Sequence, residues 1–117
     1  MAGQETIYIL HEVRPKPGQA QRFLAAYLER YAPGARARGM TLVHTLVSPP
    51  LWLEDESNTL QFLWSVTGAA GVWGSYFASR SDESVERWWW QEAAPLLESR
   101  VRRVLAAADD VAGLCDV

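Results

Sequence analysis

The stretch from Thr6 to Arg14, which reads TIYILHEVR, constrains the fold more than any other part of this chain. Its β-branched and aromatic residues favour a strand, and the run is apolar on both faces through Leu10. Such a strand is usually covered on both sides, which predicts a central position in a sheet. Side chains alternate along a strand, so one face carries Ile7, Ile9, His11 and Val13 and the other carries Tyr8, Leu10, Glu12 and Arg14. His11 is therefore predicted to lie in an apolar row.

Length and composition predict one globular domain. The chain has 117 residues, of which 49% are hydrophobic and 21% charged, so it can build one core but not two. We assign residues 1–117 to a single domain, with a core at about 6–107 and a tail at 108–117. The net charge of -3 gives no reason to expect a nucleic-acid partner. The nearest basic cluster, Arg100, Arg102 and Arg103, is interpreted as a solvated edge.

Signals for export or membrane insertion are missing from the sequence. The N-terminal residues MAGQET lack the basic and apolar regions of a signal peptide, and no apolar run approaches the roughly 20 residues that cross a bilayer. We expect a cytoplasmic protein without a membrane partner. Its single cysteine, Cys115, cannot form an internal disulfide.

Further along the chain, turn residues separate strand-like and helix-like segments. The apolar stripe Ala20, Phe23, Leu24, Tyr27, Leu28, Tyr31 predicts a helix over about 19–32, which Pro33-Gly34 could end or residues 35–38 could extend. Later segments are strands over about 40–47 and 59–67, a helix over 69–78, and a second helix that starts near Ser81 or Asp82 and is interrupted by Pro95. For Ser99–Ala107, local propensity favours a helix and the count of elements favours a strand.

The resulting order is β-α-β-β-α-β, which predicts an α+β fold of the ferredoxin-like kind. In this fold a four-stranded antiparallel sheet carries two helices on one face. The opposite face would then expose several apolar side chains, namely Tyr8, Leu10, Val43, Val47 and Leu63. A face of this kind predicts a partner, and a symmetric homodimer, sheet against sheet, would cover it.

The strand YILHEV, the RPKPG sequence that opens an amphipathic helix, and the RGM turn into the second strand resemble the dimeric α/β-barrel superfamily. The similarity is greatest to its NIPSNAP-like branch and covers roughly Thr6 to Ala107. The resemblance implies a homodimer whose strands close into a barrel, with a small-molecule pocket in each subunit between sheet and helices. Relatives in this superfamily include cofactor-independent oxygenases of aromatic polyketides, polyketide cyclases, muconolactone isomerase and haem-degrading enzymes.

His11 and His44 are the leading catalytic candidates, because imidazole ionises near neutral pH. If both face the helices, they border one apolar cavity with the expected substrate-binding residues, which are Ile7, Ile9, Phe23, Tyr27, Phe62, Trp64, Trp73, Tyr76 and Trp88. The alternative is a pair of structural histidines. Two histidines without clustered thiols or carboxylates fall short of the usual ligand sets, so we expect no metal site. In the run Trp88-Trp89-Trp90, the first two rings can share a buried side and Trp90 is expected at the periphery.

Three functional hypotheses follow from the sequence. The first is an enzyme that uses metal-independent acid-base chemistry on a hydrophobic, aromatic or polyketide-like molecule, by oxygenation, cyclisation, isomerisation or elimination. The second is a ligand-binding or stress-response module of the same fold. The third is a haem-binding protein in which one histidine is the axial ligand. The substrate cannot be read from the sequence.

Overall fold

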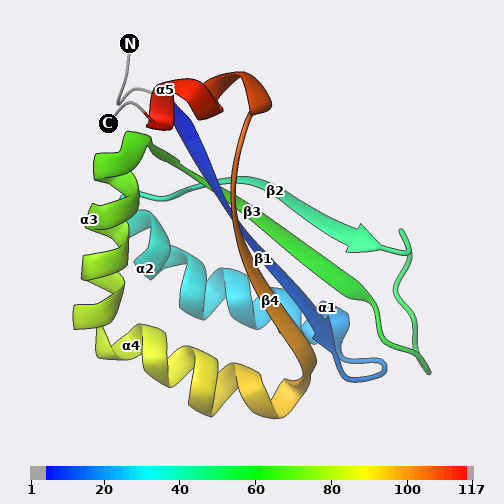
Figure 1. Ribbon diagram of the computed structural model, residues 1–117. Helices are drawn as coiled ribbons and strands as arrows, with labels where there is room; N and C mark the ends of the chain where they lie inside the picture. Colours follow the sequence, from blue (N-terminus) through cyan, green and yellow to red (C-terminus); the bar gives the residue numbers. More distant parts are fainter. Residues whose placement is uncertain (1–4, 116–117) are drawn as a thin grey trace.

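The computed structural model describes residues 5–115, with the backbone alone for residues 69, 72, 75, 77, 79, 114 and 115. Four strands form one sheet, with helices packed on one of its faces (Figure 1). The strands are β1 (Thr6–Pro15), β2 (Thr41–Ser48), β3 (Thr59–Thr67) and β4 (Leu97–Ala106). They are all antiparallel to their neighbours, in the order β2-β3-β1-β4. The predicted ferredoxin-like fold is confirmed, and β1 and β3 are its central strands.

The segment after Leu96 is a strand, which decides the question that the sequence left open. β4 pairs with β1 from Ile7 opposite Ala106 to Arg14 opposite Ser99. Because β1 would otherwise present an unpaired edge of backbone donors and acceptors, this pairing overrides the local preference for a helix.

The first helical region extends beyond the helix predicted over about residues 19–32. It comprises α1 (Ala20–Ala26), a π-helical turn η1 (Tyr27–Tyr31) and α2 (Ala32–Ala37). Pro33 does not end the helix, because it lies in the first turn of α2, directly after the π turn, where a missing amide hydrogen costs least. The region ends at Gly39, whose φ of 91° favours glycine.

The second helical region has four parts. They are α3 (Gly68–Ser81), α4 (Glu83–Glu86), a π-helical turn η2 (Arg87–Ala93) and a 3-10 turn η3 (Ala94–Leu96). Asp82 separates α3 from α4 and caps α4, since its carboxylate accepts a hydrogen bond from the Ser84 amide at 2.9 Å.

In the predicted tail, a 3-10 turn η4 (Ala108–Asp110) precedes α5 (Val111–Cys115). None of the helices in the described part of the chain has the length and apolarity needed to cross a membrane.

The core lies between the sheet and the two helical regions and is rich in aromatic rings. β1 contributes Ile7, Ile9, His11 and Val13, as the alternation predicts. β3 contributes Leu60, Phe62, Trp64 and Val66. The ring of Tyr27 stacks on Phe62 with centroids 3.7 Å apart, and Phe23 packs against both Tyr27 and Trp88.

A β-bulge in β2 places His44 on the face that carries no helices. Leu42 pairs with Trp64, but the next pairing joins His44 to Leu63, so Val43 is an extra residue. From that point the side chains have the opposite alternation to the predicted one. The expected position of His44 beside His11 is therefore wrong, and so is the expected position of Val47, which lies opposite Leu60 and packs on the core.

The opposite face of the sheet keeps a substantial apolar surface. Tyr8, Leu10 and Leu63 are half-buried there, and the edge strands add the exposed side chains of Leu46, Val101 and Leu105. The predicted apolar character of this face is confirmed, with these residues in place of Val47.

Candidate functional site

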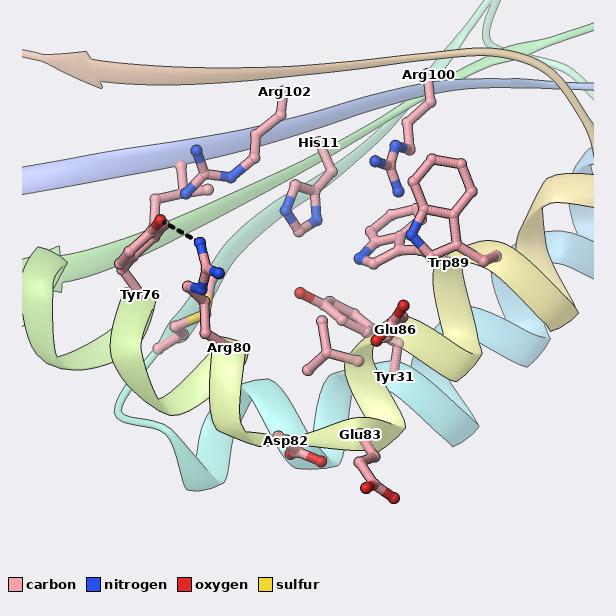
Figure 2. Close-up of a pocket in the computed structure, with 14 residues that line it drawn as sticks. His11, Tyr31, Tyr76, Arg80, Asp82, Glu83, Glu86, Trp89, Arg100 and Arg102 are labelled. Carbon is pink, nitrogen blue, oxygen red and sulfur yellow. Dashed lines mark hydrogen bonds between the residues drawn. The ribbon is translucent and has the colours of Figure 1, made fainter.

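A cavity of about 510 Å³ lies between the helix-covered face of the sheet and the corner formed by α3, α4 and η2. Figure 2 shows His11 projecting into it from β1, between Arg102 and Arg100 of β4, with Trp89 and Tyr31 across the cavity. Its lining residues are Ile9, His11, Tyr31, Met40, Tyr76, Arg80, Asp82, Glu83, Val85, Glu86, Trp89, Trp90, Arg100 and Arg102. The cavity combines aromatic rings with charged groups of both signs.

His11 is anchored from the core side by two hydrogen bonds in series. The Trp64 indole Nε1 donates to the Tyr27 hydroxyl at 2.7 Å, and the same oxygen lies 2.8 Å from His11 Nδ1. Trp64 and Tyr27 are fully buried, so water cannot replace either bond. If Tyr27 donates its hydroxyl hydrogen to Nδ1, all three polar groups are satisfied. We assign the His11 proton to Nε2, the ring nitrogen left to the cavity, on this hydrogen-bond argument.

This environment keeps His11 neutral at physiological pH. Burial, and to a smaller extent the positive charges of Arg102, Arg100 and Arg38, together lower the pKa of His11 from 6.5 to about 3. The residue is only 4% exposed. At neutral pH the imidazole can therefore donate a hydrogen bond from Nε2, but it is a weak proton acceptor.

Aromatic rings surround His11 on the helical side. Trp89 meets it edge-on with centroids 5.2 Å apart, and Tyr31 lies at 5.6 Å. Burial raises the pKa of Tyr31, while Arg38 and a hydrogen bond from Trp89 act in the opposite direction. Both rings come from π-helical turns, η1 and η2, a local geometry frequent at functional sites.

Two arginines flank His11 on the same face of the sheet. Arg102 lies directly opposite His11 in the register between β4 and β1, and Arg100 lies opposite Val13. The Arg100 guanidinium sits 4.3 Å above the centre of the Trp89 ring, and burial lowers its pKa. Among the described residues, neither arginine forms an ion pair with a carboxylate.

The acidic residues of the cavity lie on the opposite wall, in α4 and at the residue that caps it. Asp82 is engaged: it caps the helix and lies 3.4 Å from Arg38, whose side chain is only 6% exposed. Arg38 also donates to the Tyr31 hydroxyl at 3.4 Å and lies over its ring. Glu83 and Glu86 are exposed, and Glu83 points away from His11 in Figure 2.

Only three of the residues predicted from sequence line the cavity: Ile9, His11 and Tyr76. Six others form the core behind it rather than its wall, namely Ile7, Phe23, Tyr27, Phe62, Trp64 and Trp88. Trp73 is 58% exposed and does not line it, because it lies on an outer side of α3. His44 lies on the other face of the sheet for the reason given above. Tyr27 and Trp64 nevertheless contact the site through His11.

The sequence reading missed the cationic wall. Arg100 and Arg102 are two positions apart, which in a strand puts them on one face, but the sequence leaves Ser99–Ala107 open between helix and strand and the arginines are interpreted from it as a solvated edge. Trp89 was expected to be buried, and it is; its place in the cavity wall follows from the π turn. Trp90 is peripheral, as expected, and lies at the cavity mouth.

The geometry around His11 also bears on cofactor binding. Within residues 5–115, no three histidine, cysteine or acidic side chains gather as metal ligands would. An axial histidine for haem needs an unprotonated nitrogen toward the iron, whereas the bond from Tyr27 favours the tautomer with hydrogen on Nε2. The His11 environment is thus a poor fit to haem ligation.

Comparison with solved structures shows which proteins share this fold. A NIPSNAP family protein from Agrobacterium tumefaciens aligns over 91% of this chain and 89% of its own, with a TM-score of 0.68 and 18% identity. A NIPSNAP domain protein from Burkholderia xenovorans aligns over 87% of this chain and 94% of its own, with a TM-score of 0.68 and 15% identity. The sequence matches no protein-family description and none of the curated proteins.

A more distant similarity is to a Caulobacter crescentus protein named as an antibiotic biosynthesis monooxygenase. Its TM-score is 0.52 at 13% identity, over 91% of this chain and 92% of that one. At these identities the comparisons show the fold alone. They confirm that the chain has the architecture of the NIPSNAP-like branch, as the sequence resemblance predicted.

Proposed function

We propose that this protein is a metal-independent enzyme that holds a small hydrophobic, aromatic or polyketide-like molecule in the cavity beside His11. The single observation that carries the proposal is a cavity of about 510 Å³ with a buried, neutral histidine at its floor. Cavities of this size suit small organic ligands. The Caulobacter protein with this fold is named as a monooxygenase, which supports oxygenation as one of the proposed reactions.

The chemistry that suits His11 is hydrogen-bond donation rather than proton removal. A neutral Nε2–H stabilises an oxygen that gains negative charge, as in an enolate or phenolate. Oxygenation, cyclisation, isomerisation and elimination of such substrates all pass through that kind of oxygen. The low pKa of His11 equally supports the second candidate, a non-catalytic ligand-binding module, because a binding pocket needs no proton acceptor.

Occupancy of the cavity is tested with a neutral aromatic probe. Calorimetry should detect 2-naphthol binding to the wild type, and Val85→Trp, which puts an indole into the cavity wall, should abolish it. Val111→Trp adds the same ring on exposed α5 and should bind as the wild type does. Equal binding by all three proteins would place the ligand elsewhere and refute the proposal.

The catalytic part is tested with anthrone, an enolisable aromatic ketone that dioxygen converts to anthraquinone and water. We expect the wild type to accelerate this conversion and His11→Ala to lose the acceleration while still binding 2-naphthol. If His11→Ala accelerates the conversion as much as the wild type does, His11 takes no part in the chemistry. A Soret band on adding haemin that is lost in His11→Ala would instead support the haem alternative.

We further propose that two copies form a homodimer through the sheet faces that carry no helices. The exposed Val101 and Leu105, beside half-buried Tyr8 and Leu10, support this arrangement. Light scattering should give about twice the 13.1 kDa chain mass at micromolar concentration. Leu105→Glu should shift the mass toward the monomer and Val111→Glu should not; a wild-type monomer would contradict the dimer.

A further inference from the structure

Three features of the molecule are not explained by the proposed function. The buried Nε of Arg38 has no hydrogen-bond partner among the described residues, but its guanidinium is held by Asp82 and Tyr31. Within the same part of the chain the indole Nε1 of Trp88 also has no partner, but Trp88 does not line the cavity. Arg100 and Arg102 line the cavity on either side of His11 and have no carboxylate partner among the described residues, so their positive charges are available to a ligand.

From this arrangement we infer that Arg102 and Arg100, with His11 between them, form a subsite for an anionic oxygen group on a planar aromatic ligand. The inference rests on the proposed ligand-binding function and names its ligand class: an aromatic acid or the ionised enol of an aromatic ketone. The rest of the ligand would lie against Trp89 and Tyr31.

The geometry of the strands supports an anion at this place. Arg100 and Arg102 are alternate residues of β4, so both side chains leave the sheet on the helix-covered side. Because Arg102 is the cross-strand neighbour of His11, its guanidinium and the imidazole originate about 5 Å apart at their Cβ atoms. In Figure 2 the Arg102 guanidinium lies on one side of the imidazole, toward Tyr76 and Arg80, and the Arg100 guanidinium lies on its other side, next to Trp89.

The donor set suits a carboxylate or enolate oxygen. Guanidinium groups present planar, fork-shaped pairs of N–H donors that match such groups, and an Nε2–H of neutral His11 adds another donor. Arg80 projects into the cavity from α3 and donates to the Tyr76 hydroxyl at 3.0 Å (Figure 2). Three arginines thus line the cavity around His11, while Asp82 is already paired with Arg38 on the opposite wall.

The aromatic wall suits the remainder of such a ligand. The guanidinium of Arg100 lies over Trp89 at 4.3 Å and near Trp90 at 5.6 Å, which holds its donors close to the rings. A flat aromatic acid can therefore direct its charged end to the sheet and its ring to Trp89 and Tyr31. A neutral aromatic molecule of the same shape would leave both arginines without an anion.

The test compares 2-naphthoate with its neutral amide, 2-naphthamide, by calorimetry at neutral pH. The wild type should bind the carboxylate at least about tenfold more tightly than the amide, since a charge-assisted hydrogen bond is lost in the amide. Arg102→Gln should remove this preference. Arg103→Gln is the matched control, because Arg103 is the next residue of the same strand, faces the other side of the sheet and pairs with Glu12 at 3.7 Å.

Added salt provides a second readout. Raising the ionic strength should weaken 2-naphthoate binding to the wild type and leave 2-naphthamide binding unchanged. Equal affinity for both compounds, with 2-naphthol still excluded by Val85→Trp, would overturn the anionic subsite and leave the proposed function standing. If none of the three naphthalene compounds binds, both the anionic subsite and the proposed function are overturned. A preference for the carboxylate that persists in Arg102→Gln would also overturn the assignment.

Discussion

Replacing Tyr27 with phenylalanine is expected to lower the free energy of unfolding by about 2–3 kcal/mol, a large effect for the loss of one oxygen atom. The Tyr27 hydroxyl is bonded to Trp64 Nε1 at 2.7 Å and lies 2.8 Å from His11 Nδ1. Both partners are buried, so the variant leaves an indole N–H and an imidazole nitrogen without a hydrogen bond. Each such group costs roughly 1–3 kcal/mol, and a small rotation of His11 can recover part of this.

Urea unfolding of the wild type and Tyr27→Phe at neutral pH measures the change. Tyr76→Phe is the control, because it removes a hydroxyl hydrogen-bonded to Arg80 at 3.0 Å on an exposed ring. For Tyr76→Phe we expect the free energy of unfolding to fall by less than about 0.5 kcal/mol. If the two variants are equally stable, the series of bonds from Trp64 to His11 does not hold the histidine in place.

The sheet could be predicted because its signals are local. In Thr6–Arg14 and Thr59–Thr67 every second residue is a large apolar side chain, with His11 as the exception, and the structure buries those rows. The order of elements then limited the topology to few choices. β4 carries three arginines among ten residues and offers no such alternation, so only its pairing with β1 identifies it as a strand.

The candidate site could be predicted only in part, because its position depends on irregular backbone. A strict period of two puts His44 beside Leu42, and the bulge at Val43 reverses this. A strict period of 3.6 correctly puts Tyr31 and Trp89 on buried faces, but it does not reveal that both rings, which lie in π turns, form part of the cavity wall. Irregularities of this kind depend on tertiary pairing, which the sequence around them does not reveal.

The stability of the protein is expected to fall as the pH falls from about 6.5 to about 3, and His11 is the expected cause. The unfolded chain binds a proton at His11 below its ordinary pKa of 6.5, whereas in the folded protein burial and Arg102, Arg100 and Arg38 lower that pKa to about 3. The unfolded state therefore holds more protons in this window, so unfolding becomes more favourable with acid. Each pH unit removes about 1.4 kcal/mol, to a total of roughly 4–5 kcal/mol.

The interval from pH 6.5 to 4.5 isolates this effect. Asp82 also makes the protein less stable as the pH falls. Its pKa is lowered from 3.8 by its bonds to Ser84, so its contribution to stability is lost only at lower pH. Urea unfolding should show a loss of about 2–3 kcal/mol in the wild type across the interval and a nearly flat dependence in His11→Gln. His44→Gln, which changes the exposed histidine on the other face, should keep the wild-type slope. Equal slopes in wild type and His11→Gln would mean that folded His11 ionises near neutral pH, and general acid-base catalysis would then displace hydrogen-bond donation as its role.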